Sequence, residues 1–236
     1  MSLVRSALFS VPMIAICTIV LGTLSLLDSF FDRTGNSQHL LARAWAKMLL
    51  AVCFIRVRVE GLEKLDPRGA YVFVANHGSF MDIPALLAFL PQQFRFFAKK
   101  SLFRIPFLGT HLRRAGHIPV DRSNPRASLK SMTEAAQIIS GRGVSVLNFP
   151  EGGRSAVGLR AFKEGPAYVA IKAGVPVVPV AIVGMRELLP MGSGHLRSGD
   201  VVLRVGDPIA TKGLHASDRT ELTERLYREV SQLLDE

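Results

Sequence analysis

The sequence predicts an α/β protein with a mixed, largely parallel sheet flanked by helices, behind an N-terminal membrane-associated helix pair. After Gly61, short apolar runs rich in β-forming residues alternate with helical patterns, which is typical of a buried, largely parallel sheet. Residues 6–27 carry no charge. With 236 residues, 48% of them apolar, the chain is long enough for one good-sized core. We expect residues 1–58 to hold the helix pair and residues 59–236 to form one domain.

The uncharged run at residues 6–27 would be about 33 Å long as a helix, roughly the hydrocarbon thickness of a bilayer. Arg5 precedes the run and Asp28 follows it. A signal peptide is disfavoured, because a single basic residue precedes the run and no clear cleavage site follows it. Two alternatives stay open: a single membrane span, and a helix pair seated in one leaflet together with the segment that follows.

A second helical segment follows at residues 38–55. Arg43 and Lys47 lie four residues apart, on one face, and Trp45 suits the depth of lipid headgroups. We expect an amphipathic helix at the membrane interface. The alternative is an ordinary surface helix that packs on the domain.

The remaining chain predicts six strands and five helices. The strands are expected at residues 71–75, 94–98, 116–120, 144–149, 176–183 and 201–205. The helices are expected at residues 83–90, 106–114, 126–140, 166–173 and 218–234. Pro176 and Pro179 argue against a central, fully bonded strand. An edge strand would tolerate them, and plain core packing explains the apolar run on chemistry alone.

The first candidate site lies where the strand at 71–75 ends, at His77 and Asp82. Side chains five apart on one regular helix point about 140° apart and would not meet. They can meet if His77 lies in the loop before the helix and Asp82 in its first turn. A histidine held by a carboxylate can remove the proton from a hydroxyl nucleophile. The alternative is structural, with Asp82 as a helix cap and His77 bound to a carbonyl.

A basic stretch occupies residues 92–130, with apolar residues interleaved and Asp121 as its one acid. This mixture suits a phosphorylated lipid at a membrane, since charges meet headgroups and rings meet chains. The alternative is a solvated basic face. Its cations are Arg95, Lys99, Lys100, Arg104, Arg113, Arg114, Arg122, Arg126 and Lys130.

A third candidate site follows the strand at 144–149. Gly152 and Gly153 let backbone amides approach an anion closely, and Arg154 can bind a phosphate with two hydrogen bonds. Glu151 could order Arg154 or a substrate hydroxyl. Read alone, the stretch is also compatible with a glycine turn and a surface salt bridge.

Charge and cysteine content narrow the function classes. The net charge of +10 favours a polyanionic partner, either nucleic acid or an anionic membrane. No pattern of a known nucleic-acid-binding motif is present, and the apolar N-terminus favours the membrane. Cys17 and Cys53 make no disulfide framework, and no zinc-type spacing occurs, so we expect no metal.

Four stretches between residues 70 and 185 resemble, in order, the motifs of the 1-acylglycerol-3-phosphate O-acyltransferases, the PlsC-like glycerolipid acyltransferases. His77 through Asp82 is similar to that family's H-x4-D motif. The second stretch runs from Lys99 to Arg122, the third covers residues 149–155 and the fourth covers residues 175–179. Ser101 and Gly153 depart from the family, which commonly has Glu at the first position and Thr or Ser at the second.

The resemblance implies transfer of a fatty acyl chain from acyl-CoA or acyl carrier protein to the sn-2 hydroxyl of 1-acylglycerol 3-phosphate, giving phosphatidic acid. It implies His77 as general base, Asp82 as the residue that orients it, and residues 59–236 as the acyltransferase domain. No cofactor is implied besides the thioester. The residues expected to bind substrate are Lys99, Lys100, Arg104, Arg122, Glu151, Gly152, Gly153 and Arg154.

Alternatives to this function stay open. Because of Gly153, lyso-ornithine lipid, a related lysolipid or glycerol 3-phosphate could be the acceptor. A non-catalytic lipid-binding membrane protein would keep the basic groove without the chemistry. Expected partners are membrane lipids, the lysophospholipid and, as a donor, acyl carrier protein, with no nucleic acid. We expect the protein at a membrane, on the cytoplasmic face of the inner membrane.

Overall fold

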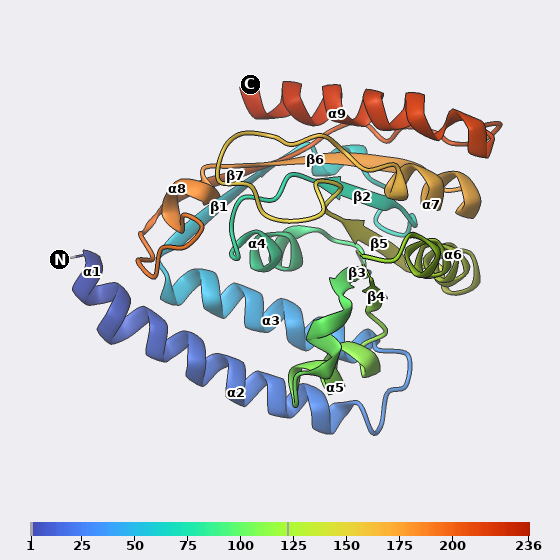
Figure 1. Ribbon diagram of the computed structural model, residues 1–236. Helices are drawn as coiled ribbons and strands as arrows, with labels where there is room; N and C mark the ends of the chain where they lie inside the picture. Colours follow the sequence, from blue (N-terminus) through green and yellow to red (C-terminus); the bar gives the residue numbers. More distant parts are fainter. Residues whose placement is uncertain (1, 122) are drawn as a thin grey trace.

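The computed structural model describes residues 2–121 and 123–236 and contains a seven-stranded sheet with helices on both faces (Figure 1). The strand order is β1-β7-β6-β2-β5-β3-β4. All neighbours are parallel except β6 and β7, so the expected mixed, largely parallel sheet is confirmed. The strands are β1 (Ile55–Glu60), β2 (Val72–Ala75), β3 (Phe94–Lys99), β4 (Ile118–Val120), β5 (Ser145–Asn148), β6 (Val177–Val183) and β7 (Gly199–Val205).

The helices lie close to the ranges expected from the sequence. Short 3-10 turns occur at Leu62–Lys64, at Lys100–Arg104 (η3) and at Ala216–Asp218. The α-helices are α1 (Ser2–Arg5), α2 (Val11–Asp28), α3 (Asn36–Val52), α4 (Asp82–Phe89), α5 (Leu108–Arg114), α6 (Pro125–Arg142), α7 (Gly165–Ala173), α8 (Met185–Leu188) and α9 (Arg219–Asp235).

The strand β2 lies at the centre of the sheet and separates two apolar cores. Its side chains alternate, as a strand requires. Val72 and Val74 face the core under α6, α7 and α9, whereas Phe73 and Ala75 face the core under α3 and α4. Both faces of β2 are therefore buried, which explains why its sequence is apolar without alternation.

The strand β1 is not among the expected strands. Charged residues alternate with apolar ones along it, because one of its faces is exposed, and Arg56 pairs with Asp200 of β7 at 2.7 Å on that face. Because charged and apolar residues are mixed in it, this short strand is not distinguished from the helical segment that precedes it. The domain boundary expected at residue 58 falls inside β1, and the division into two parts otherwise stays a prediction.

The expectation for Pro176, which directly precedes β6, and for Pro179 within it requires a correction. An edge strand was the position expected to tolerate them, but β6 lies between β7 and β2, in the middle of the sheet. Pro179 is tolerated because its ring nitrogen faces the β7 side at the point where that pairing ends, beyond the pair Val180–Val205. The Pro179 carbonyl still accepts a hydrogen bond, from the Gly206 amide at 2.9 Å. The core-packing alternative fits, since Val177–Ile182 is buried.

Residues 2–28 form one continuous helix that is apolar and long enough to cross a membrane, and little of it is buried. It consists of α1, a π-helical turn at Ser6–Ser10, and α2. Figure 1 shows this helix running beside α3, with α5 near its C-terminal end. Small and hydroxyl side chains face the domain along its whole length. Five of them form hydrogen bonds with the domain. These pairs are Ser6 with the Leu196 amide, Ser10 with the Val52 carbonyl, Thr18 with the Trp45 indole, Ser25 with the His111 ring, and Ser29 with the Arg114 guanidinium.

Helix α3 is packed between α2 and the domain. Ala46, Leu49 and Leu50 are buried, and the Arg43 guanidinium donates to the Pro91 carbonyl at 3.0 Å. These contacts match the alternative of a surface helix on the domain. Contact of α3 with a membrane stays a prediction.

His39, a buried residue of α3, and His117 make the fold sensitive to acid. Burial, together with the charges of Arg95 and Arg43, lowers the pKa of His39 to about 3. Burial also lowers the pKa of His117, which accepts a hydrogen bond from the Phe96 amide. Below pH 6.5, His39 binds a proton in the unfolded chain but stays neutral in the folded protein. The neutral His39 therefore contributes stability that is fully present above pH 6.5 and is lost as the pH falls towards 3.

We therefore expect His39→Leu to flatten the pH dependence of stability. Between pH 7.5 and 5, the wild-type free energy of unfolding should fall by about 2 kcal/mol more than that of the variant, at about 1.4 kcal/mol per pH unit below 6.5. Urea unfolding at both pH values in one detergent measures the difference. Equal pH slopes in the two proteins would contradict the assignment.

Candidate active site

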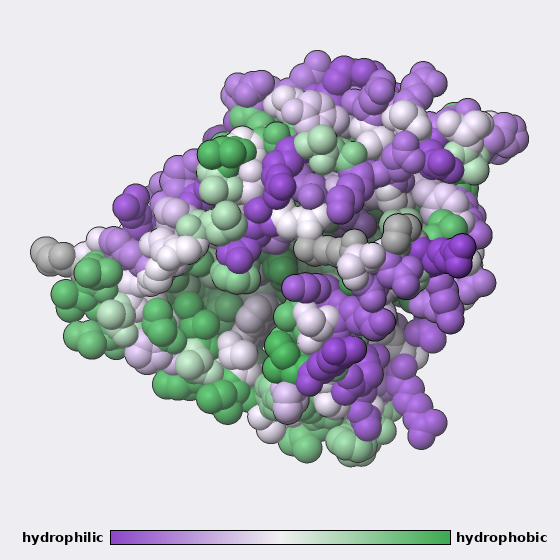
Figure 2. Space-filling view, viewed as in Figure 1, coloured by the Kyte–Doolittle hydropathy of each residue, from purple (hydrophilic) through white to green (hydrophobic). Residues whose placement is uncertain are grey.

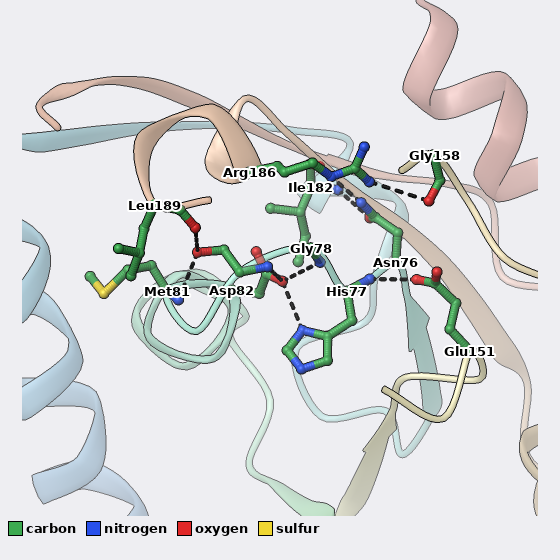
Figure 3. Close-up of polar contacts among 11 residues, drawn as sticks. Asn76, His77, Gly78, Met81, Asp82, Glu151, Gly158, Ile182, Arg186 and Leu189 are labelled. Carbon is green, nitrogen blue, oxygen red and sulfur yellow. Dashed lines mark hydrogen bonds and ion pairs between the residues drawn. The ribbon is translucent and has the colours of Figure 1, made fainter. Parts of the chain in front are cut away.

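The site is built at the C-terminal end of β2, in the middle of the sheet, where the chain enters a loop before α4. The loop is fixed to the neighbouring strand by Asn76, whose side chain forms two hydrogen bonds with Ile182 of β6. Its Nδ2 donates to the carbonyl at 3.0 Å, and its Oδ1 accepts from the amide at 2.7 Å. On the other flank, the Ser79 hydroxyl donates to the Leu189 carbonyl at 3.1 Å. The loop is thus tied to the sheet and to the segment after α8 (Figure 3).

His77 and Asp82 meet in the way the sequence allowed. His77 lies in the loop and Asp82 is the first residue of α4, and His77 Nδ1 is 2.8 Å from Asp82 Oδ2. The same oxygen accepts the amides of Gly78 at 2.9 Å and Ser79 at 2.8 Å. An ionised carboxylate can only accept, so Nδ1 carries the proton and Nε2 presents its lone pair. The His77 side chain is 13% exposed and that of Asp82 is 2% exposed.

The backbone of His77 is clamped by the loop that follows β5. Its amide donates to Glu151 Oε1 at 2.7 Å, and its carbonyl accepts from the Ser155 amide at 2.8 Å. The His77 ring stacks on Phe149, with centroids 4.0 Å apart and an interplanar angle of 16°. The imidazole is therefore held from its main chain, from its face and from Nδ1, whereas its Nε2 has no hydrogen-bond partner among the described residues and can meet a substrate.

Glu151 has a different environment from the one considered in the sequence. It is buried, and its second oxygen accepts the Arg160 amide at 3.0 Å. Burial raises the pKa of Glu151, and the two amide donors oppose that rise. Both of its oxygens bind backbone amides, so Glu151 orders the His77 loop. A direct role for Glu151 in substrate binding stays a prediction.

The glycine pair forms a turn beside a lysine that the sequence did not single out. Gly152 has φ +74°, a conformation that favours glycine, and a Cβ there would lie 3.0 Å from Cε and Nζ of Lys163. Gly153 follows and is half-buried. The Lys163 amide donates to the Pro150 carbonyl at 3.0 Å, which brings its chain back beside the turn. Lys163 is thus a further cation next to the predicted phosphate site.

Arg154 is half-buried and lies against Phe80, a residue of the His77 loop. Its guanidinium carbon is 3.4 Å from the centroid of the Phe80 ring, a cation–π contact. Phe80 is 62% exposed, so this contact holds the arginine at the surface of the site. The sequence offered no signal for Phe80 or for the stacking of Phe149, because both depend on how separate loops meet.

Among the described cations of the basic stretch, Arg95 is buried and donates to the Thr34 carbonyl at 3.0 Å, whereas Lys99, Lys100 and Arg104 are exposed and lie away from these contacts. Lys99 ends β3, whereas Lys100 and Arg104 belong to η3, and Lys100 pairs with Asp121 at 3.3 Å. Among the described residues, these three cations form no hydrogen bond or ion pair with the His77 loop. Their substrate roles stay predictions, and Arg122 lies outside the described residues.

A cavity of about 410 Å³ lies behind the His77 loop and is lined by Asn76, Gly78, Asp82 and Arg186, among others. Figure 3 shows Arg186 and Gly158 on the side of the loop away from the His77 ring. The Arg186 guanidinium donates to the Gly158 carbonyl at 3.4 Å. No group of three or more His, Cys, Asp or Glu side chains suited to a metal occurs in residues 2–121 and 123–236.

Comparison with known proteins agrees with this geometry. A family model described as Acyltransferase matches residues 56–183, which include the His77 loop and the turn after β5. The crystal structure of the 1-acyl-sn-glycerophosphate (LPA) acyltransferase PlsC from Thermotoga maritima superposes with a TM-score of 0.79 at 30% identity. That match covers 99% of this chain and 98% of the other.

Curated relatives are similar over most of this chain. A chloroplastic 1-acyl-sn-glycerol-3-phosphate acyltransferase of Brassica napus is 37% identical over 76% of this chain and 52% of its own length. A human 1-acyl-sn-glycerol-3-phosphate acyltransferase alpha is 32% identical over 75% of this chain and 65% of its own length. The chain spans about half the length of the plant relatives it matches.

The fold and the site define an α/β protein with a histidine–aspartate pair at the end of a central parallel strand. The chain belongs to the acyltransferase family, and its resemblance to the PlsC-like glycerolipid acyltransferases is confirmed.

Proposed function

We propose that this protein transfers a fatty acyl chain from acyl-CoA or acyl carrier protein to the sn-2 hydroxyl of 1-acylglycerol 3-phosphate, giving phosphatidic acid. The observation that carries the proposal is the His77 imidazole, which is fixed at Nδ1 by a buried carboxylate and presents Nε2 to the substrate side. The names of the relatives in plants and in human support the acceptor.

In the proposed mechanism, His77 Nε2 removes the proton of the acceptor hydroxyl as its oxygen attacks the thioester carbonyl. Asp82 stabilises the imidazolium that forms, and the three N–H groups on its Oδ2 keep it in place. The new ester bond forms, the carbon–sulfur bond breaks, and the imidazolium returns its proton to the departing thiolate. The step needs neither a metal nor a covalent acyl-enzyme.

Arg154 is proposed to bind the acceptor phosphate. Its contact with Phe80 orients the guanidinium, and planar guanidinium groups suit bidentate binding of phosphate oxygens. The Gly153 amide and the ammonium of Lys163, which lies beside the same turn, are proposed as further donors, whereas the Gly152 amide already donates to the Phe149 carbonyl at 3.0 Å. Lys99, Lys100, Arg104 and Arg122 are proposed as further contacts to anionic parts of the two substrates.

The apolar helix is proposed to lie in one leaflet instead of crossing the bilayer. The domain forms hydrogen bonds with the helix from Ser6 to Ser29, so one side of the helix is packed against the domain along its whole length. A spanning orientation would carry Arg114 and the loop at Leu196 to opposite faces of hydrocarbon about 30 Å thick. Figure 2 shows apolar surface over α1 and α2 and a hollow with an apolar lining near α4, which suits acyl chains entering from a membrane. We place this membrane surface on the cytoplasmic face of the inner membrane.

His77→Ala should reduce turnover by about 10²–10⁴-fold and leave membrane association intact. Asp82→Asn should also reduce turnover, because an amide can present its N–H to the ring and favour the wrong tautomer. The assay uses detergent-purified protein, labelled oleoyl-CoA and a panel of lysophosphatidic acid, lyso-ornithine lipid and glycerol 3-phosphate. Robust product from His77→Ala would refute the mechanism. If product forms only with another acceptor, that acceptor replaces lysophosphatidic acid in the proposal. If no product forms with any acceptor, the assay is repeated with acyl carrier protein as the donor.

Arg154→Ala should raise the KM for the acceptor by about 10–100-fold with a smaller change in kcat, because a charge-assisted contact to the phosphate is lost. Arg160→Ala is the matched control. Arg160 lies in the same loop with an exposed side chain, and the Glu151 contact uses its backbone amide. Steady-state kinetics at saturating donor measure both variants. An unchanged KM in Arg154→Ala would remove Arg154 from the acceptor site.

Single cysteines at Ser2 and Thr34 test the position of the helix in the membrane. Both residues are exposed and lie at opposite ends of the apolar helix, while native Cys17 and Cys53 are buried. In sealed membrane vesicles of uniform orientation, a membrane-impermeant maleimide should label Ser2→Cys and Thr34→Cys from the same side. That side should also label Ser217→Cys, which marks the domain. Labelling of the two helix ends from opposite sides would show that the helix spans.

A further inference from the structure

A second basic site lies at the far end of the apolar helix, where α2 and α5 end next to each other. A cavity of about 410 Å³ opens there, lined by Ser29, Phe30, Arg33, Arg113 and Arg114. It shares no lining residue with the cavity behind the His77 loop. None of these residues has a part in the mechanism proposed above.

Two of the three arginines are held in place by uncharged acceptors. The Arg114 guanidinium donates to the Ser29 carbonyl at 3.3 Å and hydroxyl at 3.2 Å, and it lies 4.3 Å from the centroid of the Phe30 ring. Arg113 donates to the Phe103 carbonyl and to Thr110 Oγ1. These bonds fix the positions of the two guanidinium groups without neutralising their charge.

Carboxylates do not compensate this charge. Within residues 2–121 and 123–236, none of the three guanidinium groups forms an ion pair. The nearest acids in sequence, Asp28 and Asp32, both accept from the Ser37 hydroxyl, and Asp32 also accepts the Thr34 and Ser37 amides. Those hydrogen bonds lower the pKa of Asp32 and turn both carboxylates towards the start of α3. The cavity is therefore a concave site with three cationic side chains and no anionic partner.

Phe30 lines the cavity, and further exposed apolar side chains lie on α2, directly after it and at the start of α5. Phe30 is 66% exposed and Phe31 is 90% exposed, an unusual position for two aromatic rings in water. On the helix, Leu24 and Leu27 are exposed as well. Residues 105–108, which lead into α5, add the exposed side chains Ile105, Phe107 and Leu108. Rings and aliphatic chains beside cations match the boundary between acyl chains and phosphates in a bilayer.

We propose that this corner binds the phosphate of an anionic membrane phospholipid that is not a substrate of the reaction. The three arginines bind the phosphate oxygens, and Phe30 and Phe31 enter the acyl region beside it. The site would hold the end of α2 at headgroup depth. The inference rests on the membrane attachment proposed above and is independent of the acyl transfer.

The test measures lipid binding without an acyl donor, so that it does not depend on the reaction. Protein purified in a neutral maltoside detergent is titrated with dioctanoyl phosphatidylglycerol, and bound lipid is counted by native mass spectrometry. The triple variant Arg33→Gln, Arg113→Gln, Arg114→Gln should bind about 100-fold more weakly, at roughly fivefold per arginine. The control Arg68→Gln, Lys212→Gln, Arg228→Gln removes the same charge from exposed positions outside α2 and α5 and should bind as the wild type does.

Three further arms make the result decisive. Dioctanoyl phosphatidylcholine should bind wild type more weakly than phosphatidylglycerol, and Phe30→Ser, Phe31→Ser should weaken binding of the lipid while leaving any weak binding of inorganic phosphate unchanged. If inorganic phosphate competes for the site as well as the lipid does, the ligand of the site would be a free anion and not a lipid. Equal binding by the triple variant and the control would overturn the site. Loss of acyl carrier protein binding in the triple variant, with lipid binding intact, would reassign the surface to a protein partner.

If the triple variant is not folded, Arg33→Lys, Arg113→Lys, Arg114→Lys retains the charge and removes the bidentate geometry. It should bind the lipid more weakly than wild type, though more tightly than a charge-free site. Binding equal to wild type in this variant would contradict bidentate recognition of the phosphate. Activity of the same preparations on lysophosphatidic acid separates failure of this site from failure of the proposed reaction.

Discussion

One carboxylate oxygen, Asp82 Oδ2, organises the candidate active site. It accepts hydrogen bonds from the His77 ring and from the amides of Gly78 and Ser79, so the loop between β2 and α4 folds around a single buried anion. A buried charge is costly unless hydrogen bonds surround it, and these three donors meet that need. The same bonds determine the tautomer of His77 and the direction of Nε2. The geometry of catalysis and the conformation of the loop therefore depend on the same group.

The loop is held in this shape at its start, where neighbouring segments bind its first two residues. Asn76 binds both backbone groups of Ile182 on β6, and Glu151 and Ser155 bind the two backbone groups of His77 from the loop after β5. Parallel neighbours bring the C-terminal ends of β2, β5 and β6 to one edge, which is where α/β folds assemble sites from separate segments. The strands β7 and β1, which run antiparallel to the others, complete the sheet beyond β6.

The apolar helix illustrates a second constraint, since it must be apolar towards lipid and still recognise the domain. Its domain-facing side meets both needs with small residues and hydroxyl groups, which approach closely and supply hydrogen bonds at intervals along the helix. Gly22 shows how close the approach is, because a Cβ there would lie 2.8 Å from the ring of Phe107. Phe107 itself has a positive φ of 67°, so the turn before α5 accepts strain to place that ring against the helix.

The sequence by itself determined the α/β class and most helices and strands within a few residues, and it allowed the meeting of His77 with Asp82 as one of two interpretations of their spacing. These features follow from local periodicity, from short spacings, and from motifs that resemble a family. It missed β1, whose exposed face carries charge, and it favoured an edge for β6, because the neighbours of a strand are not visible in its own residues. Only the tertiary structure decided that Glu151 orders the His77 backbone, that Phe80 and Phe149 hold Arg154 and His77, and that Lys163 lies beside Gly152. Each of these contacts joins segments far apart in the chain, and their distance in space is set by the packing of the whole sheet.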